Sequence, residues 1–127
     1  MNLLFDVERA VHEAARKARK TPSLAAFRDA LADTLARHEL GFERQVWLPE
    51  HWAGMELNCG DLFDFVVEGR VAVVLAKSAR ELLDREKRLA EGLDRAGLEA
   101  GLAVWLDATK KEDRCRRVSP AGCGTGA

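Results

Sequence analysis

The acidic residues that could support hydrolysis do not form a pair in this sequence. Two carboxylates on one face of an element could support metal-assisted or acid–base catalysis. Asp61 and Asp64 are three residues apart, and strand positions with that separation lie on opposite faces. Asp64 is therefore a single candidate ligand. A carboxylate at a strand edge that accepts a backbone hydrogen bond is the alternative interpretation.

The cysteines and histidines lack the spacing of a metal site. The three cysteines include no C-x-x-C pair, and the three histidines show no H-E-x-x-H spacing. A loop histidine at His51 and a buried Cys59 explain these residues better than joint ligation with Cys115. The odd number of cysteines also argues against a disulfide framework. We expect a cytoplasmic protein with no metal ligands and no cofactor.

Two basic clusters are candidate contacts for nucleic acid, one at the end of an expected helix and one near the C-terminus. The candidate contact residues in them are Arg16, Lys17, Lys20, Lys110, Lys111 and Arg114. Either cluster could contact phosphate, but cations also suit a helix C-terminus and charged runs are usually solvated. Trp47 and Trp52 could stack on a base or a partner, or pack within a hairpin.

Apolar residues at three- and four-residue spacing predict helices over 3–19 and from about 22 to 38. Thr21 is the expected N-cap of the second helix, and Pro22 suits its first position. A third helix is expected from the S-x-x-E capping box at Ser78 to about Ala96. Gly97 directly follows it as a C-cap.

Strand signals surround the third helix. The run VAVVLA at 71–76 suits a central strand covered on both faces. The other expected strands are 42–48, 57–67 and 102–106, with a loop over 49–54. A helix between two strands marks a βαβ crossover. The order predicts an α/β fold, with a mixed sheet of four to five strands, an antiparallel hairpin at 61–76 and flanking helices.

Length and composition limit the number of domains and the functions that the chain could have. The 127 residues fit one domain, over 1–118, and the small residues of 119–127 predict a disordered tail. The net charge of −1 does not support general binding to nucleic acid. We see no signal peptide and no apolar run long enough to span a membrane.

Several short motifs of the sequence occur in a recognisable order. LGFERQVWLP (40–49) precedes Gly54, Cys59-Gly60 and Asp64, and then VEG (67–69). Over about residues 11–118 this order resembles the GxxExxY family, placed in the restriction-endonuclease-like PD-(D/E)xK superfamily. The resemblance implies a restriction-endonuclease-like core of one helix, a three-stranded hairpin unit, a helix and a strand.

The resemblance also implies a nuclease site that holds Mg²⁺ or Mn²⁺, and most of that site is replaced here. Asp64 matches the family's strand-ending Asp. The E-x-K pair falls on Val74 and Ala76, and the Glu of the family signature falls on Leu24. The Gln of the later helix falls on Arg88. Only one of three carboxylates therefore remains.

We expect a catalytically inactive nuclease-fold protein that acts as a binding or interaction module. Its partner could be nucleic acid, another protein or a second copy. The alternative is a metal-dependent nuclease with a site rebuilt around Asp64 and Lys77, with Glu68 or Glu43. Lys77 is one residue late, so it needs a bulge to reach the same face. In a third hypothesis the fold is incidental and the chain has no affinity for nucleic acid.

Overall fold

The computed structural model describes residues 2–18, 23–47, 50–52, 55–57, 62–107 and 112–120. Its helices are α1 (Leu3–Ala18), α2 (Leu24–Arg37) and α3 (Ala79–Ala96). Its strands are β1 (Phe42–Trp47), β2 (Glu50–Trp52), β3 (Met55–Leu57), β4 (Leu62–Val67), β5 (Val71–Ala76), β6 (Ala100–Asp107) and β7 (Glu112–Val118).

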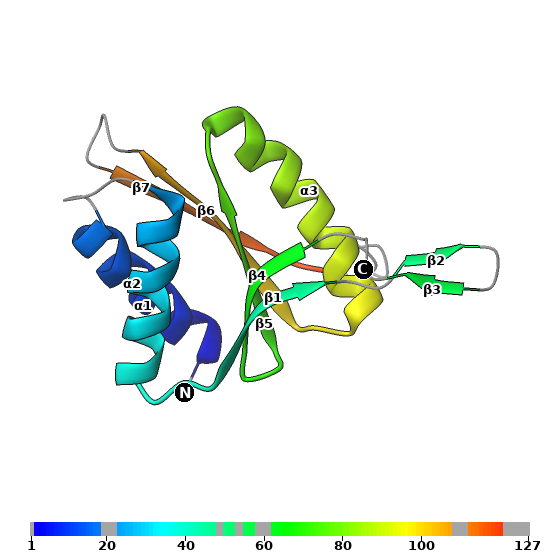
Figure 1. The fold of residues 1–127 in the computed structure, drawn as a ribbon, viewed down its shortest axis with the longest axis horizontal. Helices are drawn as coiled ribbons and strands as arrows, with labels where there is room; N and C mark the ends of the chain where they lie inside the picture. Colours follow the sequence, from blue (N-terminus) through cyan, green and yellow to red (C-terminus); the bar gives the residue numbers. More distant parts are fainter. Residues whose placement is uncertain are drawn as a thin grey trace.

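One mixed five-stranded sheet forms the middle layer, in the order β1-β4-β5-β6-β7. Only β5 and β6 run parallel, and they are joined through α3, as the predicted crossover requires. The hairpin expected at 61–76 is the antiparallel pair β4–β5. Helices α1 and α2 lie on one side of the sheet and α3 on the other (Figure 1). This arrangement confirms the predicted α/β class and the restriction-endonuclease-like core.

Two apolar layers bury the two faces of the sheet. Every residue of β5 is buried, because helices cover both of its faces. The α1/α2 layer contains Val7, Val11, Phe27, Leu31, Leu35, Phe65, Val67, Val71, Val73, Leu75, Leu102 and Val104. The α3 layer contains Phe63, Val66, Ala72, Val74, Ala76, Leu82, Leu89, Leu93, Ala103 and Val118.

Local capping sets where the helices begin and end. The expected cap of α3 is confirmed, since Ser78 Oγ accepts from Glu81 N at 3.1 Å. Gly97 ends the helix with a left-handed φ of 71°. The expected cap of α2 is wrong: Ser23, in extended conformation, accepts from Ala26 N at 3.0 Å, and the helix begins at Leu24. Thr21 and Pro22 lie outside the described residues.

Three strands, β2, β3 and β7, were not expected. Residues 50–52, predicted as part of a loop, form β2, which pairs with β3 in a separate two-stranded sheet. Residues 112–118 form β7, although five of the seven are charged. Charges suit a strand at the edge of a sheet, where one side faces water. The charged residues of this segment therefore resembled a solvated surface segment, and the sequence did not predict a strand there.

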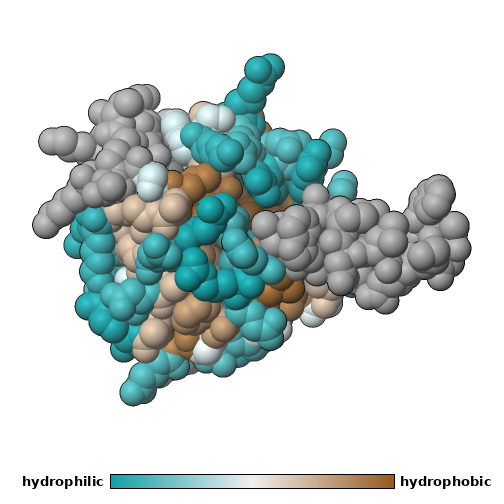
Figure 2. All heavy atoms as spheres, viewed as in Figure 1, coloured by the Kyte–Doolittle hydropathy of each residue, from teal (hydrophilic) through white to brown (hydrophobic). Residues whose placement is uncertain are grey.

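On the face shown in Figure 2, hydrophilic side chains lie around and between apolar ones. The large exposed apolar side chains of the described residues are Phe5 and Leu83, which lie on different helices. No described helix combines the length and the hydropathy needed to cross a bilayer.

Candidate functional site

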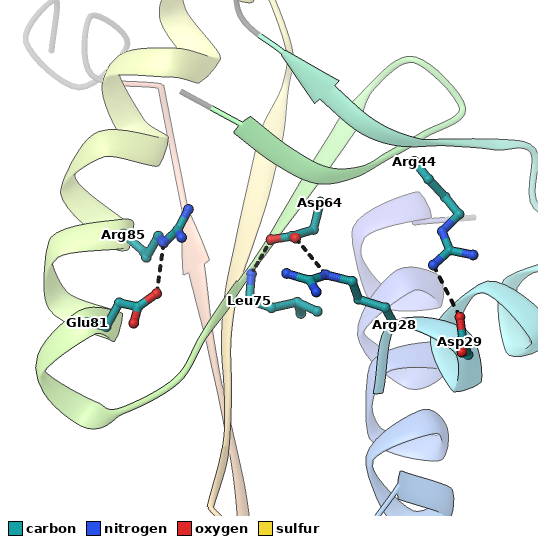
Figure 3. A network of polar contacts seen from close by, with 7 residues as sticks. All are labelled: Arg28, Asp29, Arg44, Asp64, Leu75, Glu81 and Arg85. Atoms are coloured by element: carbon teal, nitrogen blue, oxygen red, sulfur yellow. Dashed lines mark hydrogen bonds and ion pairs between the residues drawn. The ribbon is translucent and has the colours of Figure 1, made fainter. Parts of the chain in front are cut away.

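Asp64 of β4 is the candidate ligand, and its carboxylate is buried and fully engaged by the protein. The residue is only 3% exposed. Its Oδ1 accepts from Arg28 Nε at 3.0 Å, and its Oδ2 accepts from the backbone N–H of Leu75 at 2.8 Å. Figure 3 shows Arg28 reaching from α2 toward this carboxylate. Both oxygens therefore already have donors from the protein.

Asp64 lies where β4 and β1 change the face that their side chains present. Residues two apart on a strand normally share a face. Phe65 nevertheless packs in the α1/α2 layer, whereas Phe63 packs in the α3 layer. The opposite strand changes in the same place, where Gln45 has a left-handed φ of 52°. This paired distortion frees the Asp64 side chain from the regular alternation.

The carboxylate of Asp64 also continues the β4–β5 ladder beyond its last backbone pair. The described Cα register ends with Phe65 opposite Val73. Two residues further along β5, the N–H of Leu75 donates to the Asp64 side chain instead. A buried backbone donor without an acceptor is costly. Asp64 therefore has a structural role in this sheet.

Arg28 is the residue of this site that the sequence did not predict. It lies four residues after Leu24, so the two positions share one face of α2. Leu24 is where the resembling family has a glutamate. A cation one turn after Leu24, where the resemblance implies a glutamate, is a signal that sequence reasoning could have used. The Arg28 side chain is 29% exposed, so part of its guanidinium borders solvent.

A second arginine from the edge strand borders the same region. Arg44 Nη2 contacts Asp29 Oδ1 of α2 at 3.3 Å. Its guanidinium carbon also lies 5.7 Å from the ring centroid of Phe65, within the range of a cation–π contact. On the α3 side, Arg85 Nε contacts Glu81 Oε1 at 3.2 Å (Figure 3). Arg28 therefore contacts Asp64 directly, and Arg44 lies over the ring of the neighbouring Phe65.

The expected E-x-K positions carry no chemistry. Val74 is 3% and Ala76 is 1% exposed, and both pack in the α3 layer. Lys77 is the first residue after β5 and is exposed, next to the buried Ala76. The described residues place no bond between Lys77 and Asp64. Arg88, the expected Gln position, instead contacts Asp84 Oδ2 at 3.3 Å on the exposed part of α3.

The carboxylates considered for a rebuilt site lie elsewhere. Glu68 is four residues beyond Asp64, or about 13 Å along a strand. Its Oε1 accepts from Gly41 N at 2.9 Å, at the turn end of the hairpin. Glu43 is exposed and pairs in register with Val66. Within the described part of the chain, no three His, Cys, Asp or Glu side chains could hold a metal ion.

The two basic clusters are only partly described. Arg16 and Lys17 are exposed near the end of α1, and the backbone of Arg114 lies in β7 opposite Trp105. Lys20, Lys110 and Lys111 lie outside the described residues, as do Cys59 and residues 121–127. The neighbours of Arg114 are engaged in ion pairs. Arg116 Nε contacts Glu86 at 2.9 Å, and Arg117 contacts Glu8.

The comparison with protein families decides the family of this chain. The family model for the PD-(D/E)XK nuclease superfamily matches residues 6–118. The chain belongs to the PD-(D/E)XK nuclease superfamily. A search of curated proteins and a search of solved structures found no match. The family membership agrees with the mixed sheet and its flanking helices.

The donor set described around Asp64 does not fit a divalent metal. Mg²⁺ and Mn²⁺ prefer several oxygen ligands arranged around the ion. The chain offers one carboxylate at the expected place, and a guanidinium contacts it at 3.0 Å. A metal ion there would face that cation across a buried site, where repulsion is weakly screened. Among the residues that the structure describes, Asp64 therefore lacks the further oxygen ligands that such an ion needs.

Proposed function

We propose that this nuclease-superfamily domain is catalytically inactive and acts as a binding or interaction module. One observation carries the proposal: Arg28 supplies, from within the protein, the positive charge that a metal would supply beside Asp64. The carboxylate is neutralised and held by the backbone at the same time. It is thus unavailable to ligate a metal that could activate water.

The apolar replacements support the same proposal on energetic grounds. An unmatched charge in a buried position is costly, so a Glu and a Lys without a metal would destabilise the sheet. Val74 and Ala76 instead pack beneath α3. Once catalysis is not selected, substitutions of this kind stabilise the fold. The sequence therefore combines an intact core with a site converted to structural use.

The motifs at 40–49 and 54–75 support membership of the GxxExxY branch of the superfamily. The irregular cysteine spacing supports a cytoplasmic location. The balanced charge supports a partner recognised by a local surface, because a strongly basic face is the usual footprint of a nucleic-acid binder. A protein partner is therefore favoured over generic binding to DNA or RNA.

A cleavage assay tests the proposal. The parent chain and an Asp64→Asn variant are incubated with labelled single- and double-stranded DNA and RNA, with Mg²⁺, Mn²⁺ or EDTA. Asn keeps an oxygen that can accept from Leu75 N–H, so the fold is preserved better than with Ala. Asp29→Asn is the matched control, because Asp29 is an exposed acid that contacts Arg44. We expect no cleavage by any of the three proteins.

Cleavage that requires a metal and is lost only in Asp64→Asn would instead establish the rebuilt nuclease site. Direct titration of the parent with Mn²⁺, followed by calorimetry or by the electron spin resonance of the ion, gives a second readout. We expect no saturable binding that depends on Asp64. Native gels of the same samples, at two salt concentrations, then test whether any phosphate-dependent binding exists.

A further inference from the structure

A groove lies between the middle of α1 and the end of α2, on the outer surface of the helical layer. It has a volume of about 480 Å³ and is lined by Arg9, His12, Glu13, Arg16 and His38. A smaller hollow of about 190 Å³ continues from it past Asp6 and Leu40. The larger volume is within the range of about 300–1,000 Å³ typical of small-molecule sites.

The spacing on α1 explains why these side chains meet. Arg9, His12, Glu13 and Arg16 follow the i, i+3, i+4, i+7 pattern of one helix face. Arg9 and Arg16 are two turns apart, about 10.5 Å along the axis, and both are exposed. Neither makes an ion pair with a residue that the structure describes. Their guanidinium donors are thus available on the two sides of the groove.

The one carboxylate between them is already neutralised. Glu13 Oε2 lies 2.8 Å from His38 Nε2, and its Oε1 accepts from Arg37 Nη2 at 3.4 Å. A carboxylate only accepts, so the Nε2 of His38 carries the proton of this contact. The hydrogen bond from His38, more than the nearby charge of Arg37, lowers the pKa of Glu13. Glu13 therefore repels an anion in the groove less than an unpaired acid would.

We propose that this groove binds the phosphate group of a small phosphate monoester, with Arg9 and Arg16 as its main ligands. Guanidinium groups match phosphate oxygens in geometry as well as charge. A short groove with cations on either side suits one terminal phosphate. A continuous basic track, which a nucleic-acid backbone would need, is not formed by these residues, because Asp6 lines its extension.

An NMR titration of the full chain with inorganic phosphate, at constant ionic strength set by chloride, tests the proposal. We expect saturable shifts of amides in α1 and at the end of α2. An Arg9→Gln/Arg16→Gln double variant should bind at least about tenfold more weakly. Lys17→Gln is the matched control, since Lys17 is an exposed neighbour of Arg16 outside the groove, and should bind as the parent does.

Titrations with other ligands distinguish a phosphate monoester from other classes of ligand. Adenosine monophosphate should bind and adenosine should not. The proposal is overturned if phosphate shifts do not saturate or if the double variant binds like the parent. Binding only of a DNA oligonucleotide without terminal phosphates would also overturn it.

Discussion

At the scale of single residues, Asp64 holds together three parts of the protein. Its carboxylate joins α2 through Arg28 and β5 through the N–H of Leu75, while its own backbone lies in β4. Truncation would leave a buried N–H donor and a partly buried guanidinium without their acceptor. This cost falls on stability rather than on catalysis, which separates the proposed role from that of a metal ligand.

Urea unfolding of Asp64→Ala, Asp64→Asn, Arg28→Gln and the corresponding double variants tests this role. We expect Asp64→Ala to lower the free energy of unfolding by about 2–4 kcal/mol, less than a fully buried pair because Arg28 is 29% exposed. Asp64→Asn should cost less, because its amide oxygen still accepts from Leu75. Additive effects of Asp64 and Arg28 substitutions would contradict the coupling between them.

The Glu13–His38 contact predicts a pH-dependent stability. The pKa of Glu13 is lowered in the folded chain, first by the hydrogen bond from His38. A lowered pKa stabilises the fold above the unfolded value of 4.5, and this contribution is lost as the pH falls through the folded pKa. Glu13→Gln should therefore lower the Tm near about pH 7. The difference from the parent should shrink in acid.

Thermal unfolding at several pH values measures this effect, and Glu91→Gln is the control. Glu91 is exposed on α3 and makes no ion pair with a described residue. Its substitution should leave the pH dependence of the parent unchanged. A Glu13→Gln difference of the same size at every pH would mean that the substitution acts through packing, not through the charge of Glu13.

Residue types explain why the sequence predicted Asp64 but not its partner. Asp64 stands out as an acid between apolar residues of a strand. Arg28 stands among other charged residues of an amphipathic helix, where most arginines face solvent. Its role depends on how close α2 lies to β4, because Arg28 and Asp64 are 36 positions apart in the sequence. Only the folded sheet brings that distance to 3.0 Å.

At the scale of elements, close packing between α3 and β6 depends on a residue without a side chain. An added Cβ at Gly101 would lie 2.8 Å from Leu89 Cδ2 and 3.1 Å from Leu93 Cδ1. Leu89 and Leu93 are themselves 2% and 0% exposed. The helix can thus approach the sheet closely only where β6 has this glycine.

Gly101→Ala should therefore lower the free energy of unfolding by about 1–3 kcal/mol through overpacking. Leu89→Ala alone should cost about 2–5 kcal/mol because it leaves a cavity. The double variant should cost less than the sum of the two, since the new methyl group fills part of that cavity. Urea unfolding measures all three, and a double variant at least as damaging as the sum would refute the proposed close approach.

Helices and strands whose signals lie within a short stretch of sequence could be predicted. Strands that depend on pairing with a strand elsewhere in the chain could not. The cap at Ser78, the apolar run of β5 and the stop at Gly97 all lie within a short stretch of sequence. Strand β7 has no such signal, because five of its seven residues are charged and its pairing with β6 at the edge of the sheet defines it. The Ser23 cap was missed because Thr21 and Pro22 offered an equally good signal two residues earlier.

At the scale of the whole molecule, the main sheet and the β2–β3 sheet should differ in local stability. Strand β5 is buried on both faces and paired on both sides. An isolated two-stranded hairpin is only marginally stable in water. Amide hydrogen exchange should therefore be slowest in β5 and β6 and fast in β2 and β3. Equal protection of both sheets would show that the hairpin is held by further contacts.

The order of the strands has a consequence during protein synthesis. Strand β5 can form a hairpin with β4 as soon as it is made, but its other neighbour, β6, is translated only after the whole of α3. Until then the nascent chain presents the apolar run 71–76 with one unpaired edge. Edges of this kind bind chaperones or aggregate. The central strand is therefore the segment of the nascent chain that most needs protection at the ribosome.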